Sequence, residues 1–311
     1  MIDIIIPAYN AHDTIKRTLL SILQQNNIKN INTYIIDDHS KIGYEKEYNL
    51  FKNKMNLFLI RLNKNMGPGY ARQYGINKSK SKYILFMDSD DLLYNCESVE
   101  KLYNEIERNN LDAVTGDLME IDGEESVLYT VGFDVLHAKM YRRSFIKQKN
   151  ISFPNFYHSE DLSFNNLVLM NRAKIGYCDS VIYVYQRRKN SLTMKEEYYQ
   201  NEHIKYYCEN LIWTIKEAEK NGVIKKEIAK IVTFSFAYLY YYFFDNIEDD
   251  NIEYMNEIVP IYKKYNKYLN KEEKAEQINF WLERMEIYPG DMTFNEFISL
   301  CYKNCKKTNR T

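Results

Sequence analysis

The chain has few cysteines and glycines, and it carries no excess of charge of either sign. Its five cysteines lie far apart, at positions 96, 178, 208, 301 and 305, without the spacing of a metal site or a disulfide framework. Such cysteines fit a reducing cytoplasm. With 42 basic and 43 acidic side chains among 311 residues, the net charge of −1 argues against a general nucleic-acid-binding protein, which would carry a strongly basic face. Ten glycines and five prolines stand beside 29 tyrosines, a bias that AT-rich coding produces without a functional cause.

A long hydrophobic run is also missing. The segment Ile231 to Phe244 has 14 residues, whereas a membrane-spanning helix needs roughly 20 apolar residues, so we expect a buried core helix there. Met1-Ile2-Asp3 lacks the basic start of a signal peptide. We therefore expect a cytoplasmic protein.

One segment near the end of the chain raises the question of a membrane surface. An apolar stripe runs into a basic terminus there; the residues are Phe294, Phe297, Ile298 and Cys301, followed by Lys303, Lys306, Lys307 and Arg310. We favour a solvated basic terminus, with peripheral contact at the inner face of the membrane as the alternative.

The first 120 residues alternate between strand and helix patterns. Apolar residues make up 45% of the chain, enough for a sizeable core. The run from Ile2 to Ala8 is continuously apolar, as expected of a strand buried on both faces. Further strands are expected at Thr33 to Asp37, Leu57 to Leu62, Tyr83 to Met87 and Ala113 to Leu118, and helices at about Tyr70 to Asn77 and Glu97 to Asn109. This alternation predicts an α/β fold with a doubly wound, mostly parallel sheet.

The pattern changes beyond residue 120. Val135 to Tyr141 and Ile175 to Tyr185 are typical of strands, on either side of a helix at about Asp161 to Met170. From Lys195 onward the chain is helical, charged and rich in tyrosine. We therefore expect a catalytic domain over residues 1–193 and a helical C-terminal extension over residues 194–311.

Polar clusters follow three of the expected strands, at residues 37–40, 63–72 and 88–91. Ligands bind beyond the carboxyl ends of the strands in such sheets, so these clusters can converge on one site. The sharpest is Asp88-Ser89-Asp90, because two carboxylates one residue apart suit Mg²⁺ or Mn²⁺ carrying a diphosphate. Acidic loops and helix caps also produce Asp-x-Asp, so this pattern alone does not establish a metal site.

Six segments together resemble the motifs of family 2 glycosyltransferases of the GT-A fold, in that family's order and spacing. Residues 5–10 (IIPAYN) resemble the opening strand, residues 36–40 (IDDHS) the acidic motif of the second strand, and residues 65–73 (NMGPGYARQ) the N-x-G-x-x-x-A-R-N segment. Residues 85–91 (LFMDSDD) resemble the metal-binding strand end, residues 160–164 (EDLSF) the E-D-x-x-F segment, and residues 185–191 (YQRRKNS) the Y-x-x-R-x-x-S segment. The resemblance covers about residues 2–193.

The resemblance implies inverting transfer of a sugar from a nucleotide-sugar donor, expected to be a UDP-sugar. The acceptor would be a hydroxyl of a glycan or lipid-linked sugar in the synthesis of a bacterial surface polysaccharide. Asp88 and Asp90 would hold Mn²⁺ or Mg²⁺. Asp161 would be the general base that takes the acceptor proton, and the neighbouring Glu160 would raise its pKa by repulsion. The alternative for both acids is a helix N-terminus, where carboxylates are favoured in any case; with the other motifs present we favour catalysis.

A set of donor-binding residues also follows from the resemblance. Asp38 would accept the imide N–H of uracil while Asp37 braces the loop, although an ordinary capped turn explains both acids as well. Arg72 would meet a phosphate or the ribose, and Arg188 would close over the diphosphate or, equally, be a solvated surface residue. The whole set is Pro7, Tyr9, Asn10, Asp38, Arg72, Asp88, Ser89, Arg188 and Ser191. His39 replaces the family's usual glycine, so a positive φ there would carry a cost.

Several alternatives stay open. For His137 we favour a packed or surface histidine over a role near the metal or the acceptor. His158 is a candidate base if Asp161 only caps a helix. One rival function is a sugar nucleotidyltransferase, which would open with a glycine-rich loop that Pro7-Ala8-Tyr9-Asn10 does not provide. Another is a non-catalytic carbohydrate-binding protein of the same fold. An oligomer is possible in each case.

Overall fold

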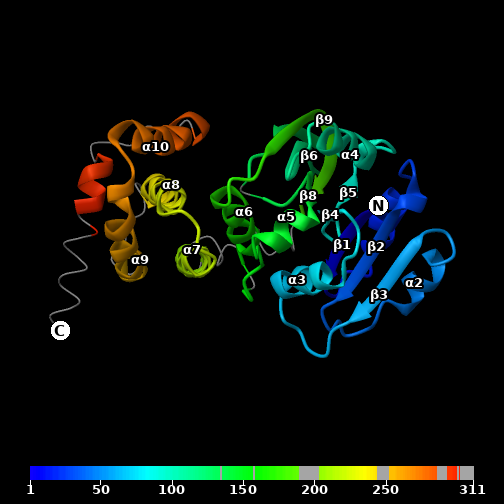
Figure 1. Cartoon of the computed structure of the whole chain (residues 1–311). Helices are drawn as coiled ribbons and strands as arrows, with labels where there is room; N and C mark the ends of the chain where they lie inside the picture. Colours follow the sequence, from blue (N-terminus) through cyan, green and yellow to red (C-terminus); the bar gives the residue numbers. More distant parts are fainter. Residues whose placement is uncertain are drawn as a thin grey trace. The chain divides into compact units, whose positions relative to one another are not determined.

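Strand β1 (Ile2–Ala8) lies inside the parallel half of a nine-stranded sheet in the computed structural model (Figure 1). Its neighbours are β2 (Ile31–Asp37) and β4 (Tyr83–Phe86), and β3 (Asn56–Arg61) pairs with β2, all in parallel. Every residue of β1 is buried, as its continuous apolar run predicts. Because these strands are parallel, β1, β2 and β4 end at the same edge of the sheet, where the three expected polar clusters begin.

The other half of the sheet is mixed, which corrects the expectation of a mostly parallel sheet. Strand β8 (Lys139–Arg142) runs antiparallel to both β4 and β6 (Ala113–Asp122). Strand β9 (Ile175–Gln186) is parallel to β6 and antiparallel to the short β5 (Leu92–Leu93). Strand β7 (Glu125–Thr130) folds back on β6 as a hairpin. The β6–β7 hairpin reverses the direction of the chain, which then continues in the reversed direction from β7 into β8.

Helices cover both faces of the sheet. On one face α1 (Ile15–Leu23), α2 (Glu45–Phe51) and α4 (Ser98–Arg108) contribute to a single core with Ile4 and Ile6 of β1. On the other face, Gly75 of α3 (Pro68–Lys78) lies against Ile5. Phe164 of α6 (Glu160–Met170) packs there against Phe86, Tyr141 and Phe153. The short helices η1 (Ile28–Asn30) and α5 (Arg143–Gln148) precede β2 and follow β8.

The expected elements are present, with some shifts at their ends. The strand expected at Val135 to Tyr141 is shorter and begins only at Lys139, because Ala138 has a positive φ of 56° that breaks the extended backbone. The expected GT-A architecture, a layered α/β fold with a helical C-terminal region, is present. The structure describes residues 1–133, 135–156, 158–188, 203–243, 252–285, 293–299 and 301.

The chain divides into two compact units, Met1–Ser191 and Leu192–Thr311. The second contains α7 (His203–Lys220), α8 (Lys225–Phe243), α9 (Ile252–Tyr265), η5 (Asn266–Tyr268) and α10 (Lys271–Met285). The expected core helix is α8, in which Val232, Phe236 and Leu239 are fully buried. Among the described helices, none combines the length and the apolar character needed to cross a bilayer.

The apolar stripe near the end of the chain is used within the second unit. Phe294 and Phe297 contact Tyr240 of α8, and Phe294 also contacts Tyr262 of α9. Phe297 and Cys301 are buried. These contacts cover the side chains that the alternative of peripheral membrane contact required to be exposed. The basic residues 303–310 lie outside the described residues.

Candidate active site

The end of β2 is held by two acids with different partners. One oxygen of Asp37 accepts the backbone N–H of Ser40 at 2.8 Å and the other pairs with Arg61 at 2.8 Å, so Asp37 braces its own loop. The buried Asp38 accepts the N–H groups of Met66 and Gly67, each at 2.8 Å. Burial raises the pKa of Asp38, and these two N–H groups only partly offset that. The loop after β3 is therefore fastened to the end of β2.

The end of β1 joins this arrangement. The backbone N–H of Asn10 donates to Ser40 Oγ at 3.0 Å, and Asn10 Oδ1 accepts the N–H of Lys41 at 2.9 Å. His39 has a φ of 61°, the positive value that the family's glycine would adopt without strain. Pro7 is buried in β1 and Tyr9 is exposed beside it. All the first-strand and second-strand candidates thus lie at one edge of the sheet.

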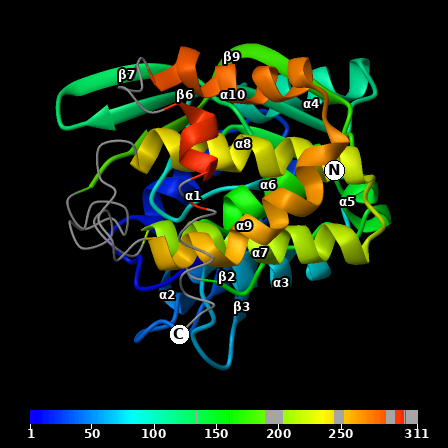
Figure 2. The same cartoon turned by 90° about the vertical axis from the view of Figure 1, so that its left-hand side faces the viewer.

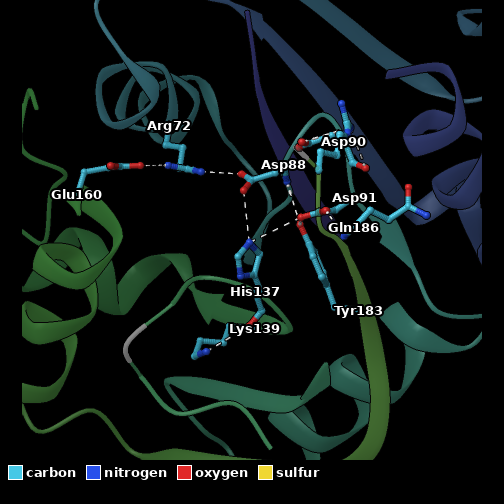
Figure 3. A network of polar contacts seen from close by, with 10 residues as sticks. Arg72, Asp88, Asp90, Asp91, His137, Lys139, Glu160, Tyr183 and Gln186 are labelled. Carbon is cyan, nitrogen blue, oxygen red and sulfur yellow. Dashed lines mark hydrogen bonds and ion pairs between the residues drawn. The ribbon is translucent and has the colours of Figure 1, made fainter. Parts of the chain in front are cut away.

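A larger group of acids follows β4, and Arg72 of α3 joins one of them, Asp88, to Glu160 at the start of α6 (Figure 3). Arg72 Nη2 lies 2.6 Å from Asp88 Oδ1, and Arg72 Nη1 pairs with Glu160 at the start of α6. Burial alone would raise the pKa of Asp88, but the charges of Arg72 and His137 outweigh it and lower that pKa. Arg72 itself is buried. The sequence predicted that it binds the sugar donor, and in the structure it is the ion-pair partner of two carboxylates.

Asp90 points to a different partner. Arg188 Nη2 lies 3.2 Å from Asp90 Oδ2, and burial together with the negative charge of Asp88 raises the pKa of Asp90. The carbonyl of Ser89 accepts the hydroxyl of Thr14 at 2.9 Å, which anchors the loop to the start of α1. Arg188 therefore lies beside the expected metal ligands, whereas Ser191 lies outside the described residues.

Sequence reasoning gave Asp91 no role, and for His137 a place near the metal or the acceptor was the less favoured alternative, yet both side chains lie among the carboxylates of the site. Asp91 Oδ2 accepts the hydroxyl of Tyr183 at 2.8 Å and lies 3.7 Å from His137 Nε2, which is 3.3 Å from Asp88 Oδ2. Burial raises the pKa of Asp91 to about 7. His137 is packed, as favoured, but its neighbours are carboxylates. Burial alone would lower the pKa of His137, and the charges of Asp88 and Asp91 outweigh burial and raise that pKa. For Asp91 the one available sequence signal was its place as the third acid in the run Asp88–Asp91.

Glu160 and Asp161 open α6 and differ in exposure. Glu160 is buried, and burial raises its pKa to about 7 despite the charge of Arg72. Asp161 is only partly buried, and its Oδ1 accepts the N–H of Leu162 at 2.8 Å. Desolvation is the main cause that raises the pKa of Asp161, while Arg72 lowers it. Repulsion between the two acids contributes to the raised pKa of Glu160, where the charge of Asp161 adds to the effect of burial. His158 is partly buried just before this helix.

A close approach of two backbones sets the position of α6. A Cβ on Gly69 of α3 would lie 2.5 Å from the carbonyl oxygen of Pro154 and 3.1 Å from Cβ of Glu160. Only glycine leaves room for this contact. Helix α3, which carries Arg72, therefore rests directly on the segment that carries Glu160.

The chemistry of the donor atoms fits a divalent cation. One ligand atom each from Asp88, Asp91 and His137 lies within 4.8 Å of the others. Two carboxylates and one imidazole form a set that suits Mn²⁺ and related ions. Asp90 is the remaining acid of this loop, and its present partner is Arg188.

The chain resembles known sugar-transferring proteins. The model of the family described as glycosyl transferase family 2 matches residues 3–163. A poly(ribitol-phosphate) beta-glucosyltransferase of Bacillus spizizenii is 28% identical over 240 residues, which are 70% of this chain and 37% of that protein. The poly(ribitol-phosphate) beta-N-acetylglucosaminyltransferase TarP of Staphylococcus aureus is 30% identical over 55% of this chain and 58% of its own length. The chain thus spans 37% and 58% of the lengths of these two relatives.

A similar fold occurs in a solved structure. The crystal structure of residues 1–349 of TarS from S. aureus, in complex with UDP-GlcNAc, superposes with a TM-score of 0.69 at 18% identity, covering 92% of each chain. At this identity the likeness concerns the fold.

Proposed function

The chain belongs to glycosyl transferase family 2, and from this membership and the geometry of the acids we propose that it transfers a sugar from a UDP-sugar to a hydroxyl of a glycan or lipid-linked acceptor, with inversion, in surface polysaccharide synthesis. One observation carries the proposal: Arg72 joins Asp88 at the end of β4 to Glu160 at the start of α6. That link brings the expected donor side and the expected base into one site. A solved relative that holds UDP-GlcNAc supports UDP as the nucleotide.

Asp161 is the general base in this proposal. The acceptor hydroxyl loses its proton as it attacks the anomeric carbon, and a carboxylate near that oxygen takes the proton. Asp161 is partly exposed beside the buried Glu160, so it is the acid of the pair that an acceptor can reach. Glu160 is committed to Arg72 and positions the start of α6 instead.

The residues on the donor side would neutralise the negative charge of the leaving diphosphate. Asp88, Asp91 and His137 would hold a divalent cation together with Asp90, and the ion would stabilise the negative charge of the leaving diphosphate as a Lewis acid. Arg188 would exchange its ion pair with Asp90 for contact with the diphosphate, since an arginine fork suits phosphate oxygens. Asp38 would bind the uracil with lone pairs that remain beside its two backbone partners.

An assay of UDP release tests the proposal against its rivals. With a panel of UDP-sugars and Mn²⁺ we expect UDP to form and acceptor glycans to gain the sugar. A nucleotidyltransferase would instead form a UDP-sugar and pyrophosphate from UTP and a sugar phosphate. A non-catalytic binding protein would release neither product, and either of these results would reject the proposed function.

A further inference from the structure

A row of side chains leads from the carboxylates to the β6–β7 hairpin, which extends past the rest of the sheet (Figure 2). Leu118 of β6 is paired with Tyr183 of β9 on one side and with Tyr129 of β7 on the other. Directly opposed residues of neighbouring strands project from the same face of a sheet. The Tyr183 hydroxyl bonds to Asp91 and to the N–H of Asp88, so this is the face that carries the site.

The next row along the strands repeats the arrangement. Glu120 of β6 is paired with Tyr185 of β9 and with Val127 of β7. The ring of His137 lies 5.5 Å from the ring of Tyr185, so this second row also begins at the site. Two adjacent rows therefore run across the sheet from the carboxylates to β7.

Strand β7 also has the right place along the sheet. The first part of β6 pairs with β8 and the later part pairs with β7, on the same side of β6. Strand β7 therefore continues the line of β8 beyond its first residue, and His137 lies just before that residue. The hairpin borders the space beyond the carboxyl ends of the parallel strands.

The exposed fraction of the side chains increases along the first row, from Tyr183 to Tyr129. Tyr183 is fully buried, Leu118 is 7% exposed and Tyr129 is 45% exposed. In the second row Val127 is 48% exposed. An exposed ring and an exposed apolar side chain beside a reactive site are features of a binding surface, and sugars present apolar C–H faces to aromatic rings.

The charge of the hairpin limits what binds there. Residues 117–130 contain five acids and no lysine or arginine. Arg187 compensates part of this, with its Nε 3.0 Å from Glu120 and its Nη1 3.9 Å from Asp122. Glu124 and Glu125 at the turn are exposed. A phosphodiester chain would meet like charge on this surface, whereas an uncharged glycan would not.

The geometry points to the exposed face of the β6–β7 hairpin, with Tyr129 and Val127, as a subsite for an uncharged glycan acceptor. This inference rests on the proposed function. The subsite would hold a sugar of the acceptor remote from the hydroxyl that is glycosylated. It would select against poly(ribitol phosphate), the polymer in the names of the two relatives described above.

The test compares the rates of transfer to different acceptors. Each assay contains the full chain, the UDP-sugar that it uses best, and Mn²⁺. The probes are octyl glycosides of the disaccharides maltose, lactose and cellobiose, which carry a second sugar beside the one that is glycosylated, and poly(ribitol phosphate). We expect transfer to at least one octyl glycoside in preference to poly(ribitol phosphate). Tyr129→Ala should raise the KM for that glycoside about tenfold, the loss of one aromatic contact, and Tyr129→Phe should restore it. Leu128→Ala is the matched control, because Leu128 is 57% exposed on the opposite face of β7 and should leave that KM within about twofold.

Three results would overturn the subsite. They are preferential transfer to poly(ribitol phosphate), an equal rise in KM for Tyr129→Ala and Leu128→Ala, and slow release of UDP without transfer to any octyl glycoside. Absence of UDP release under every condition is a different result, since it rejects the proposed function itself.

Discussion

Arg72 Nη2 lies 2.6 Å from Asp88 Oδ1, which ties helix α3 to the end of strand β4. The other end of the same guanidinium pairs with Glu160. The charge of the buried Glu160 depends on this cation, and the charge of the partly buried Asp88 is stabilised by it. Arg72 thus links the donor side of the site, at Asp88, to the base side, at Glu160.

We predict that Arg72→Met destabilises the chain by about 3–5 kcal/mol, because it leaves the buried Glu160 without its cation and removes the shorter ion pair of the partly buried Asp88. Adding Glu160→Gln should recover part of that loss by removing one of the two charges. Chemical denaturation of both variants measures this. Equal stability of Arg72→Met and the wild type would show that these ion pairs do not hold α3, β4 and α6 together.

Gly69 offers a test of the spacing between α3 and α6. Gly69→Ala places a Cβ 2.5 Å from the carbonyl oxygen of Pro154 and 3.1 Å from Cβ of Glu160, so α6 must shift. We expect a fall in transfer rate of about 10²-fold, the effect of a displacement near 1 Å at a reactive site. UDP affinity should change little. Asn77→Ala, at an exposed position of the same helix, is the control and should match the wild type.

The metal assignment predicts that UDP affinity depends on Mn²⁺ through Asp90. In calorimetry the wild type should bind UDP more tightly with Mn²⁺ than without it, because carboxylates alone repel a diphosphate. Asp90→Ala should lose this dependence, while Glu97→Ala, at an exposed acid, should keep it. Asp90→Ala binding UDP with unchanged Mn²⁺ dependence would remove Asp90 from the metal site.

The pH dependence of transfer follows from the raised pKa of Asp161. Desolvation is the main cause of the shift. A base must be deprotonated, so kcat/KM should rise with pH through this raised pKa, above the ordinary aspartate value near 4. Arg72 lowers the pKa of Asp161, so Arg72→Met should move the rise in kcat/KM to higher pH. A rate that stays constant down to about pH 4 would contradict a raised pKa at the base.

The parallel strands and the edge where the acids gather could be predicted from the sequence. The run from Ile2 to Ala8 is apolar throughout, and the acids of residues 37–38 and 88–91 come directly after apolar strands. In a parallel sheet these facts suffice to place the acids together. His39 with its positive φ could also be anticipated, since glycine was expected there.

The partners of those acids could not be predicted, because they come from distant segments. Tyr183 reaches Asp91 from a strand 92 residues later in the chain, and no local pattern marks a tyrosine for that contact. Strand β7 is exposed at every position, so it lacks the alternation by which a half-buried strand is recognised. Arg72 was expected to face a ligand, and the carboxylates that surround it become apparent only when α3 and α6 are packed.

The most direct measurement compares Asp161→Asn with Asp90→Ala in transfer rate and UDP-sugar affinity, at one Mn²⁺ concentration. Asparagine keeps the shape of the side chain but cannot take the proton, so Asp161→Asn should lose about 10²–10⁴-fold in rate and keep the donor affinity. Asp90→Ala should lose rate and donor affinity together. Transfer by Asp161→Asn at nearly the wild-type rate would contradict the account and leave Asp161 as a helix-capping acid, with Glu160 or His158 as the candidate base.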